Sequence, residues 1–184
     1  ENVVINNSGQ SSLALSLGGT YNFNHSTFGN YWTNSFRSFP TVQIDNIIPE
    51  VAEADLIEAN FTNCIIYGSE QRELGFAQSE NASLLFNFNF TNCLIAFEDP
   101  NGDFEGLPNY DFSNTTLYTN SVFNADPVFQ DVTLNNFNIK RSESGAEGIG
   151  KGGVLPILDL NGTMRNASNP DAGAYESIEF PDEG

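Results

Sequence analysis

Asn60-Phe-Thr-Asn-Cys-Ile-Ile66 and Asn89-Phe-Thr-Asn-Cys-Leu-Ile95 are nearly identical stretches of this 184-residue chain. A third stretch, Asn22-Phe-Asn-His-Ser-Thr-Phe28, aligns with both of them without a gap. Polar residues alternate with Phe in all three, which predicts a β-strand with its aromatic side chains on one face. The second Asn of the pattern favours a turn, because Asn tolerates left-handed backbone angles. The stretches therefore predict a repeated strand–bend–strand unit.

Two weaker matches extend the series, Asn2-Val-Val-Ile-Asn-Asn7 and Phe112-Ser-Asn-Thr-Thr-Leu117. Together they indicate a basal repeat of about 22–24 residues with insertions, which is typical of stacked β-strand repeats rather than helical ones. We therefore predict an all-β fold, a right-handed parallel β-helix that winds as a single-stranded solenoid. Its coils occupy residues 1–124, with insertions at about 29–58 and 98–111, and residues 125–184 form a loop-rich C-terminal cap of the same domain.

Stacked repeats place like residues on like at about 4.8 Å. The bends are then expected to carry a structural ladder of coil-to-coil hydrogen bonds, made by His25, Asn63, Asn92 and Asn114. Cys64 and Cys93 occupy the same position in adjacent repeats, and we expect two buried free thiols, since in-register parallel strands suit a disulfide poorly.

The composition excludes several classes of partner. The chain has 24 Asp and Glu against 6 Lys and Arg, a formal charge of −18. This balance argues against nucleic acid and against an anionic membrane surface, both of which need a basic footprint. No apolar run approaches the ~18 residues of a membrane span. The 16 Phe residues distinguish the chain from a disordered acidic tail.

The C-terminal third carries a series of short motifs. They are Ala125-Asp-Pro-Val-Phe-Gln-Asp131, Phe137-Asn-Ile139, Ser142 to Gly150, Asp159-Leu-Asn-Gly-Thr-Met-Arg165 and Pro170-Asp-Ala-Gly-Ala-Tyr-Glu176. In order and spacing this run resembles the end of bacterial secreted parallel β-helix proteins of the choice-of-anchor Q type. It departs from them at Ser144-Gly-Ala-Glu147, where the usual Pro is absent. The resemblance implies a β-helical fold and a location outside a bacterial cell or on its outer surface.

The motif residues also have a direct structural interpretation. Arg165 can pair with neighbouring carboxylates and pin the terminal segment over the last coil, while Tyr175 covers the end of the core. The predicted structural cap consists of Asp126, Asp159, Arg165, Asp171, Tyr175 and Glu176.

Two groups of residues are candidates for ligand binding. Aromatic faces stack on sugars, so the first group is a carbohydrate-binding set, with packing against the coils as the alternative: Tyr31, Trp32, Phe36 and Phe39. The second group offers alternating oxygen ligands for Ca²⁺, with a solvated acidic loop as the alternative: Asp99, Asn101 and Asp103. The EF-hand pattern fails here, because Gly102 and Tyr110 stand at the wrong positions.

No recognisable catalytic constellation is present, and the catalytic residues, if any, are unknown. We expect the C-terminal part of a secreted or surface-displayed protein that acts as a binding or scaffold surface for glycans or a partner protein. It could also be a subunit or cargo of a larger surface assembly. The alternative is a polysaccharide lyase or glycoside hydrolase-like enzyme whose active groove lies largely upstream.

Overall fold

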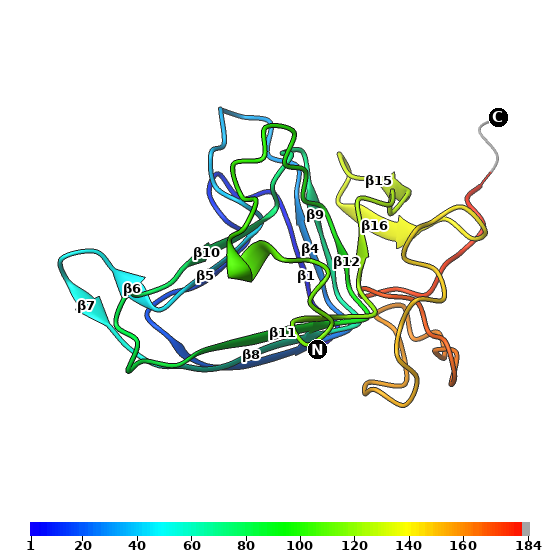
Figure 1. Ribbon diagram of the computed structural model, residues 1–184. Coiled ribbons are helices and arrows are strands. Elements are labelled where there is room, and N and C mark those ends of the chain that lie inside the picture. The colour runs from blue at the N-terminus through cyan, green and yellow to red at the C-terminus, as the bar shows by residue number, and fades with distance from the viewer. Residues whose placement is uncertain (182–184) are drawn as a thin grey trace.

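The computed structural model describes residues 1–181, and its regular structure consists of short β-strands with one 3₁₀ turn (Figure 1). Three sheets contain only parallel pairs. The five-stranded sheet has the order β1 (Val4–Ile5), β4 (Thr27–Asn30), β9 (Ile65–Gly68), β12 (Leu94–Ile95) and β14 (Val122–Phe123). The four-stranded sheet has the order β13 (Tyr118–Thr119), β11 (Phe86–Thr91), β8 (Leu56–Thr62) and β3 (Gly19–Asn24).

The three-stranded sheet has the order β10 (Leu74–Ala77), β5 (Val42–Asp45) and β2 (Leu13–Leu15). Two further pairs are antiparallel: β6 (Ile47–Ile48) with β7 (Ala52–Glu53), and β15 (Phe129–Asp131) with β16 (Asn136–Ile139). The 3₁₀ turn η1 spans Pro108–Tyr110.

The predicted right-handed parallel β-helix, wound as a single-stranded solenoid, is wrong. The strands fall into five separate sheets, two of them antiparallel pairs, and do not form one continuous solenoid. The physical reason lies in the bends, because a residue at positive φ follows each strand of the four-stranded sheet, and left-handed backbone cannot continue a sheet. The fold is β-rich, and its core is enclosed by three distinct parallel sheets.

The bends themselves fall where the repeat predicts them. His25, Asn63 and Asn92 have φ of 47°, 54° and 53°, and each follows a strand of the four-stranded sheet. The fourth residue in register is Asn120, with φ of 50°, because Thr119 pairs with Thr91. Asn114 is therefore not a member of the series.

Asn114 instead shapes the local turn that precedes β13. Its backbone carbonyl accepts hydrogen bonds from the N–H groups of Leu117 and Tyr118, and its Oδ1 accepts one from the Thr116 N–H. The bends also do not form the predicted continuous ladder. Asn63 Nδ2 lies 3.0 Å from His25 Nε2, but the side chain of Asn92 donates to a carbonyl of the C-terminal segment.

The core contains a stacked column of aromatic rings. Phe23, Phe61, Phe90 and Tyr118 stack in sequence, with ring centroids 4.9, 4.8 and 5.6 Å apart. This confirms the prediction that the Phe residues of the repeat share one face.

The two cysteines lie in adjacent parallel strand connections, as predicted. Leu94 pairs with Ile65, so Cys93 lies beside Cys64, and the Cys64 N–H donates to Cys93 Sγ at 3.4 Å. Both side chains are fully buried free thiols. Burial raises the pKa of Cys93 well above its usual value, which keeps this thiol protonated.

The predicted insertions contain more structure than expected. Residues 29–58 include β5, a central strand of the three-stranded sheet, and only the β6–β7 hairpin and residues 31–40 project from the sheets. Residues 98–111 form a loop around η1, as predicted. Phe104 and Tyr110 of this loop, and Phe112 directly after it, pack their rings against buried Phe97 and so cover one end of the core.

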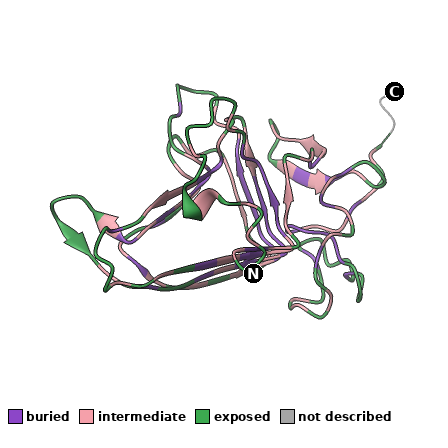
Figure 2. Ribbon diagram, in the orientation of Figure 1, coloured by how far each residue is buried: buried purple, intermediate pink, exposed green. Residues whose placement is uncertain are grey.

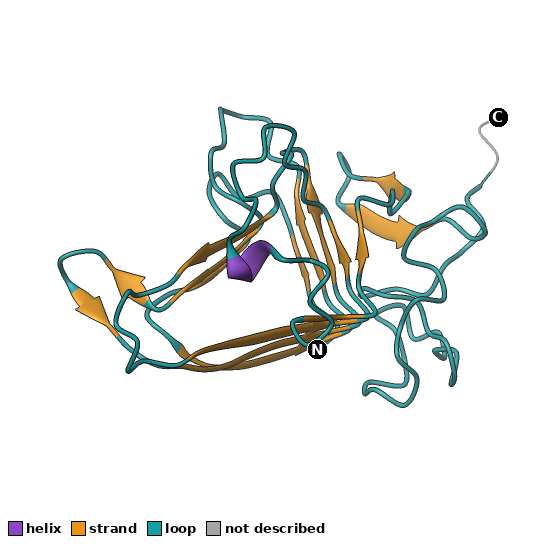
Figure 3. Cartoon of the chain, in the orientation of Figure 1, coloured by secondary structure: helices purple, strands orange, loops and turns teal. Residues whose placement is uncertain are grey.

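The C-terminal segment, residues 125–181, is mostly loop and lies beside the five-stranded sheet (Figure 3). Ala146 and Ala172 pack with Ile65 and Leu94 in a second apolar cluster, and the strands of the five-stranded sheet beside this segment are largely buried (Figure 2). The prediction that the C-terminal segment covers the last coil is therefore wrong. The segment lies at the side of the five-stranded sheet, and the loop around η1 covers the end of the core near Phe97. Residues 182–184 of the predicted cap lie outside the described residues.

Polar groups hold the C-terminal segment in place. Arg165 Nη1 lies 3.3 Å from Glu176 Oε1, Asp159 Oδ2 accepts from the Glu176 N–H, and Asp171 accepts from the N–H groups of Gly148 and Ser177. Asp126 makes a separate turn by accepting from the Val128 N–H, and Tyr175 is partly buried.

Replacing His25 with Asn should reduce the loss in free energy of unfolding that occurs as the pH falls below neutral. Burial, and secondarily the charge of Arg165, lowers the pKa of His25 from 6.5 to about 4. The unfolded chain therefore binds a proton that the folded chain excludes, so stability is lost as pH falls from about 6.5 to about 4. At pH 4 the loss is about 2–3 kcal/mol.

Urea unfolding at several pH values measures this effect. Asn occupies the equivalent bends at Asn63 and Asn92, so the variant should fold at neutral pH. The carboxylates titrate in both proteins, so only the difference between them reports on His25. Equal pH slopes for the two proteins would contradict the assignment.

Candidate binding cleft

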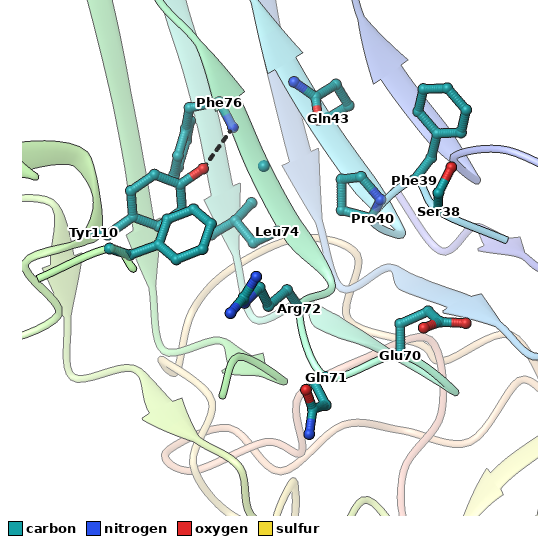
Figure 4. A pocket seen from close by; sticks show the side chains of 12 residues that line it. Ser38, Phe39, Pro40, Gln43, Glu70, Gln71, Arg72, Leu74, Phe76 and Tyr110 are labelled. Carbon is teal, nitrogen blue, oxygen red and sulfur yellow. Dashed lines mark hydrogen bonds between the residues drawn. The ribbon is translucent and has the colours of Figure 1, made fainter. Parts of the chain in front are cut away.

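A cleft of about 320 Å³ lies at the free edge of β10 (Figure 4). Three loops far apart in sequence form its walls, namely residues 38–40, 70–72 and 104–110. Figure 4 shows Phe76 and Tyr110 on one side and Ser38, Phe39 and Pro40 on the other, with Arg72 between them. The cleft combines aromatic rings with amide and guanidinium groups, which is the composition of a small-molecule site.

The side chains of Gln43 and Pro40 lie close against the backbone of Gly75 in β10. A Cβ at Gly75 would lie 2.4 Å from Gln43 Oε1 and 2.8 Å from Pro40 Cγ, so only glycine leaves room for these side chains. The Phe76 N–H donates to Tyr110 Oη at 3.1 Å, which ties the loop around η1 to this strand. Burial raises the pKa of Tyr110, so its hydroxyl keeps a proton that can be donated to a ligand.

Arg72 forms the floor of the cleft and is held on several sides. Its guanidinium carbon lies 4.7 Å from the centroid of the Phe104 ring, a cation–π contact. Nη2 lies 3.0 Å from Asp103 Oδ2 and 3.4 Å from Asp99 Oδ1. These partners fix the guanidinium and compensate its charge, and the side chain remains one-third exposed.

The predicted calcium ligands belong to this cluster. Asp99 accepts from the N–H groups of Asp103 and Phe104, so its carboxylate orders the loop as well as pairing with Arg72. Asn101 lies exposed at the loop tip. The guanidinium of Arg72 therefore occupies the position beside Asp99 and Asp103 at which the sequence predicted a Ca²⁺ ion. Within residues 1–181, no group of three or more His, Cys, Asp or Glu side chains is arranged to hold a metal ion.

The four predicted sugar-binding aromatics do not come together. Phe39 lines the cleft and is 48% exposed. Phe36 projects into solvent, and Trp32 donates its Nε1–H to Ser35 Oγ. Tyr31 packs against Phe129 and Phe137 of the C-terminal segment, which is the packing role that we considered as the alternative.

A buried ion pair positions the Phe39 loop. Arg37 and Glu73 are 2% and 0% exposed, and Arg37 donates to both carboxylate oxygens at 2.7 and 2.8 Å. Arg37 also donates to the Phe39 carbonyl, and Glu73 accepts from the backbone and hydroxyl of Thr41. Residues 37–41 are thereby fastened to the turn that leads into β10.

A second cavity, of about 530 Å³, lies in the C-terminal segment, but its carboxylates are already engaged. Asp171 and Glu147 accept from backbone N–H groups or from Ser177, and Glu176 accepts from the N–H groups of Asp171 and Asn166. These carboxylates order the segment, so the cleft beside β10 is the better candidate site.

Comparisons of the chain with protein-family models, with curated proteins and with solved structures found no match. In the part of the chain that the structure describes, no helix has the length and apolar character needed to cross a membrane.

Proposed function

We propose that the protein is a non-catalytic binding module that holds a neutral glycan in the cleft beside β10. The observation that supports this most strongly is the meeting of Phe39, Phe104 and Tyr110 with the amides of Gln43 and Gln71 in one cleft. Aromatic rings offer apolar faces to the C–H groups of a sugar, and amide and phenol groups exchange hydrogen bonds with its hydroxyls.

Electrostatics favour an uncharged ligand. The chain carries a formal charge of −18, which repels polyanionic sugars. Arg72, the cation of the cleft, is already paired with Asp99 and Asp103. A neutral oligosaccharide can use the remaining guanidinium N–H groups without displacing a carboxylate.

The C-terminal motifs support the cellular location that we propose for this binding. Their resemblance to choice-of-anchor Q proteins supports a role outside a bacterial cell or on its outer surface. Retention of glycans there requires binding alone, so the proposal assigns no catalytic step to any residue of the cleft.

Replacing Phe39 with Ala should weaken binding of a neutral oligosaccharide by about tenfold, the loss of roughly 1.4 kcal/mol of contact. The measurement is titration calorimetry with neutral hexose and N-acetylhexosamine oligosaccharides. Phe36→Ala is the matched control, because Phe36 is 87% exposed and lies outside the cleft.

Two outcomes would overturn the proposal. One is no binding across the panel, and the other is equal affinity of wild-type protein and Phe39→Ala. Release of unsaturated or shortened products during the titration would favour the lyase or hydrolase alternative instead.

A further inference from the structure

The outer face of the four-stranded sheet carries polar side chains in rows that cross the strands. Asn22, Asn60 and Asn89 pair in register across β3, β8 and β11 and form the Asn row. Asn24, Thr62, Thr91 and Thr119 pair in register across all four strands and form the Thr row. The aromatic column occupies the alternate positions, so its rings point to the opposite face.

The register of these rows is regular. The irregularities in strand pairing lie before them, between Gly19 and Thr20 on β3 and between Phe86 and Phe88 on β11. From Asn22 to Asn24 and across to the neighbouring strands the pairing is continuous. Rows of this kind repeat every ~4.8 Å across the strands and about 6.6 Å along them.

Hydrogen bonds order several of these side chains in advance. Asn60 Nδ2 donates to Asn22 Oδ1 at 3.1 Å, and Thr91 Oγ1 donates to Asn89 Oδ1 at 2.5 Å. Asn89 Nδ2 also donates to the Thr116 carbonyl. A ligand that binds to the rows therefore meets groups that have already lost much of their rotamer freedom.

The face carries little charge although the chain is strongly acidic. Neither row contains a charged residue, and the adjacent in-register pair, Thr20 and Glu58, contains one carboxylate. An uncharged, regular face on a chain of charge −18 complements an uncharged, regular surface. It is a poor match for an ion or a charged polymer.

The spacing of the rows indicates which uncharged surface fits. In tetrahedrally bonded water, oxygens joined by hydrogen bonds of about 2.75 Å to a common neighbour lie about 4.5 Å apart. That distance is close to the strand spacing, so successive Asn or Thr groups can each hold a water of one lattice row. Crystalline polysaccharides are less suited, because sugar faces pack on aromatic rings and those of these strands point inward.

We propose that the Asn and Thr rows of the four-stranded sheet bind the surface of ice. Each side chain contributes little, but many contacts form at once, and escape requires all of them to break together. This surface is separate from the cleft beside β10, and the proposal does not depend on the glycan ligand.

The test is to record ice growth in solutions of the full chain by nanolitre osmometry. Wild-type protein should shape ice into faceted crystals and open a gap between melting and freezing temperatures. Thr91→Lys, at the centre of the Thr row, should reduce this gap at least about fivefold at equal concentration, because a bulky charge prevents the remaining rows from approaching the lattice. Thr119→Lys, on the edge strand β13, provides a second variant.

Thr33→Lys is the matched control. It introduces the same charge at an exposed loop position and should leave ice shaping unchanged. Phe39→Ala should also retain it, which separates this result from the test of the cleft. Unshaped ice with wild-type protein, or equal gaps for wild-type and Thr91→Lys, overturns the proposal. A third result would also overturn it. In that case wild-type protein binds insoluble cellulose or chitin, and Thr91→Lys abolishes this binding but leaves ice shaping unchanged.

Discussion

Replacing Arg37 with Met is expected to lower the free energy of unfolding by about 3–5 kcal/mol. Arg37 and Glu73 are both almost fully buried, and the two guanidinium nitrogens meet the two carboxylate oxygens at 2.7 and 2.8 Å. Without Arg37, the Glu73 carboxylate stays in an interior site without its cation. The backbone N–H and hydroxyl of Thr41 cannot compensate a full charge.

Urea unfolding at neutral pH measures this loss. The double variant Arg37→Met/Glu73→Met should recover part of it, since it removes the buried charge together with its partner. Lys140→Met is the matched control for an exposed pair, because Lys140 and Glu143 are 34% and 56% exposed, and it should cost about 0–1 kcal/mol. A cost below about 1 kcal/mol for Arg37→Met would show that the pair contributes little.

Arg37→Met should also disturb the walls of the cleft beside β10. Arg37 donates to the Phe39 carbonyl, and Glu73 also accepts from the Glu70 N–H. Both Phe39 and Glu70 line the cleft, so the ion pair positions two of its walls from within the core.

The repeated stretches were sufficient to predict the register of three strands of the four-stranded sheet, β3, β8 and β11. Asn22, Asn60 and Asn89 pair as the alignment requires, and the bends follow at the expected positions. The fourth repeat was missed because two stretches compete for it. Phe112-Ser-Asn-Thr-Thr-Leu117 resembles the pattern, but Tyr118-Thr-Asn-Ser-Val-Phe123 is the one that pairs with Phe90 and its neighbours.

Most residues of the candidate cleft could not be predicted from the sequence. Phe39 was named for its aromatic ring, but Gln43, Arg72 and Tyr110 carry no local pattern that marks them. They meet only because Leu74 pairs with Val42 and the loop around η1 folds back on β10. The same limit explains the calcium prediction. Asp99 and Asp103 are visible as neighbouring carboxylates, whereas Arg72 approaches them from a distant segment.

The arrangement of the C-terminal segment shows a similar limit. The motifs name Asp159, Arg165, Asp171 and Glu176; Arg165 pairs with Glu176, while Glu176 and Asp159 accept from the N–H groups of Asp171 and Glu176. Their location depends on shape, because Gly173 has φ of 94° and a Cβ there would lie 2.7 Å from the Ile65 and Thr27 side chains. This close approach fits the segment to the side of the five-stranded sheet, which a motif does not encode.

Replacing Arg165 with Met is expected to release the C-terminal segment from that sheet at a cost of about 3 kcal/mol. Arg165 is buried, pairs with Glu176, and donates to the carbonyls of Gly173 and Ala174. It also donates to Asn2 Oδ1 at 2.9 Å, so one guanidinium joins the two ends of the described chain. The ring stacking of the aromatic column and the strand pairing of the three parallel sheets do not use Arg165, so these sheets should persist while the segment opens.

Hydrogen exchange separates this local opening from global unfolding. Amides that bond across the junction, such as the Gly173 N–H to the Asn63 carbonyl, should lose protection in Arg165→Met. Amides within β8 and β11 should keep it. Arg141→Met is the matched control, since Arg141 is half-exposed and lies 3.9 Å from Glu179 Oε1, a much looser ion pair. Uniform loss of protection over both regions would mean that the segment and the sheets unfold as one unit, and unchanged protection at Gly173 would mean that Arg165 does not hold the segment.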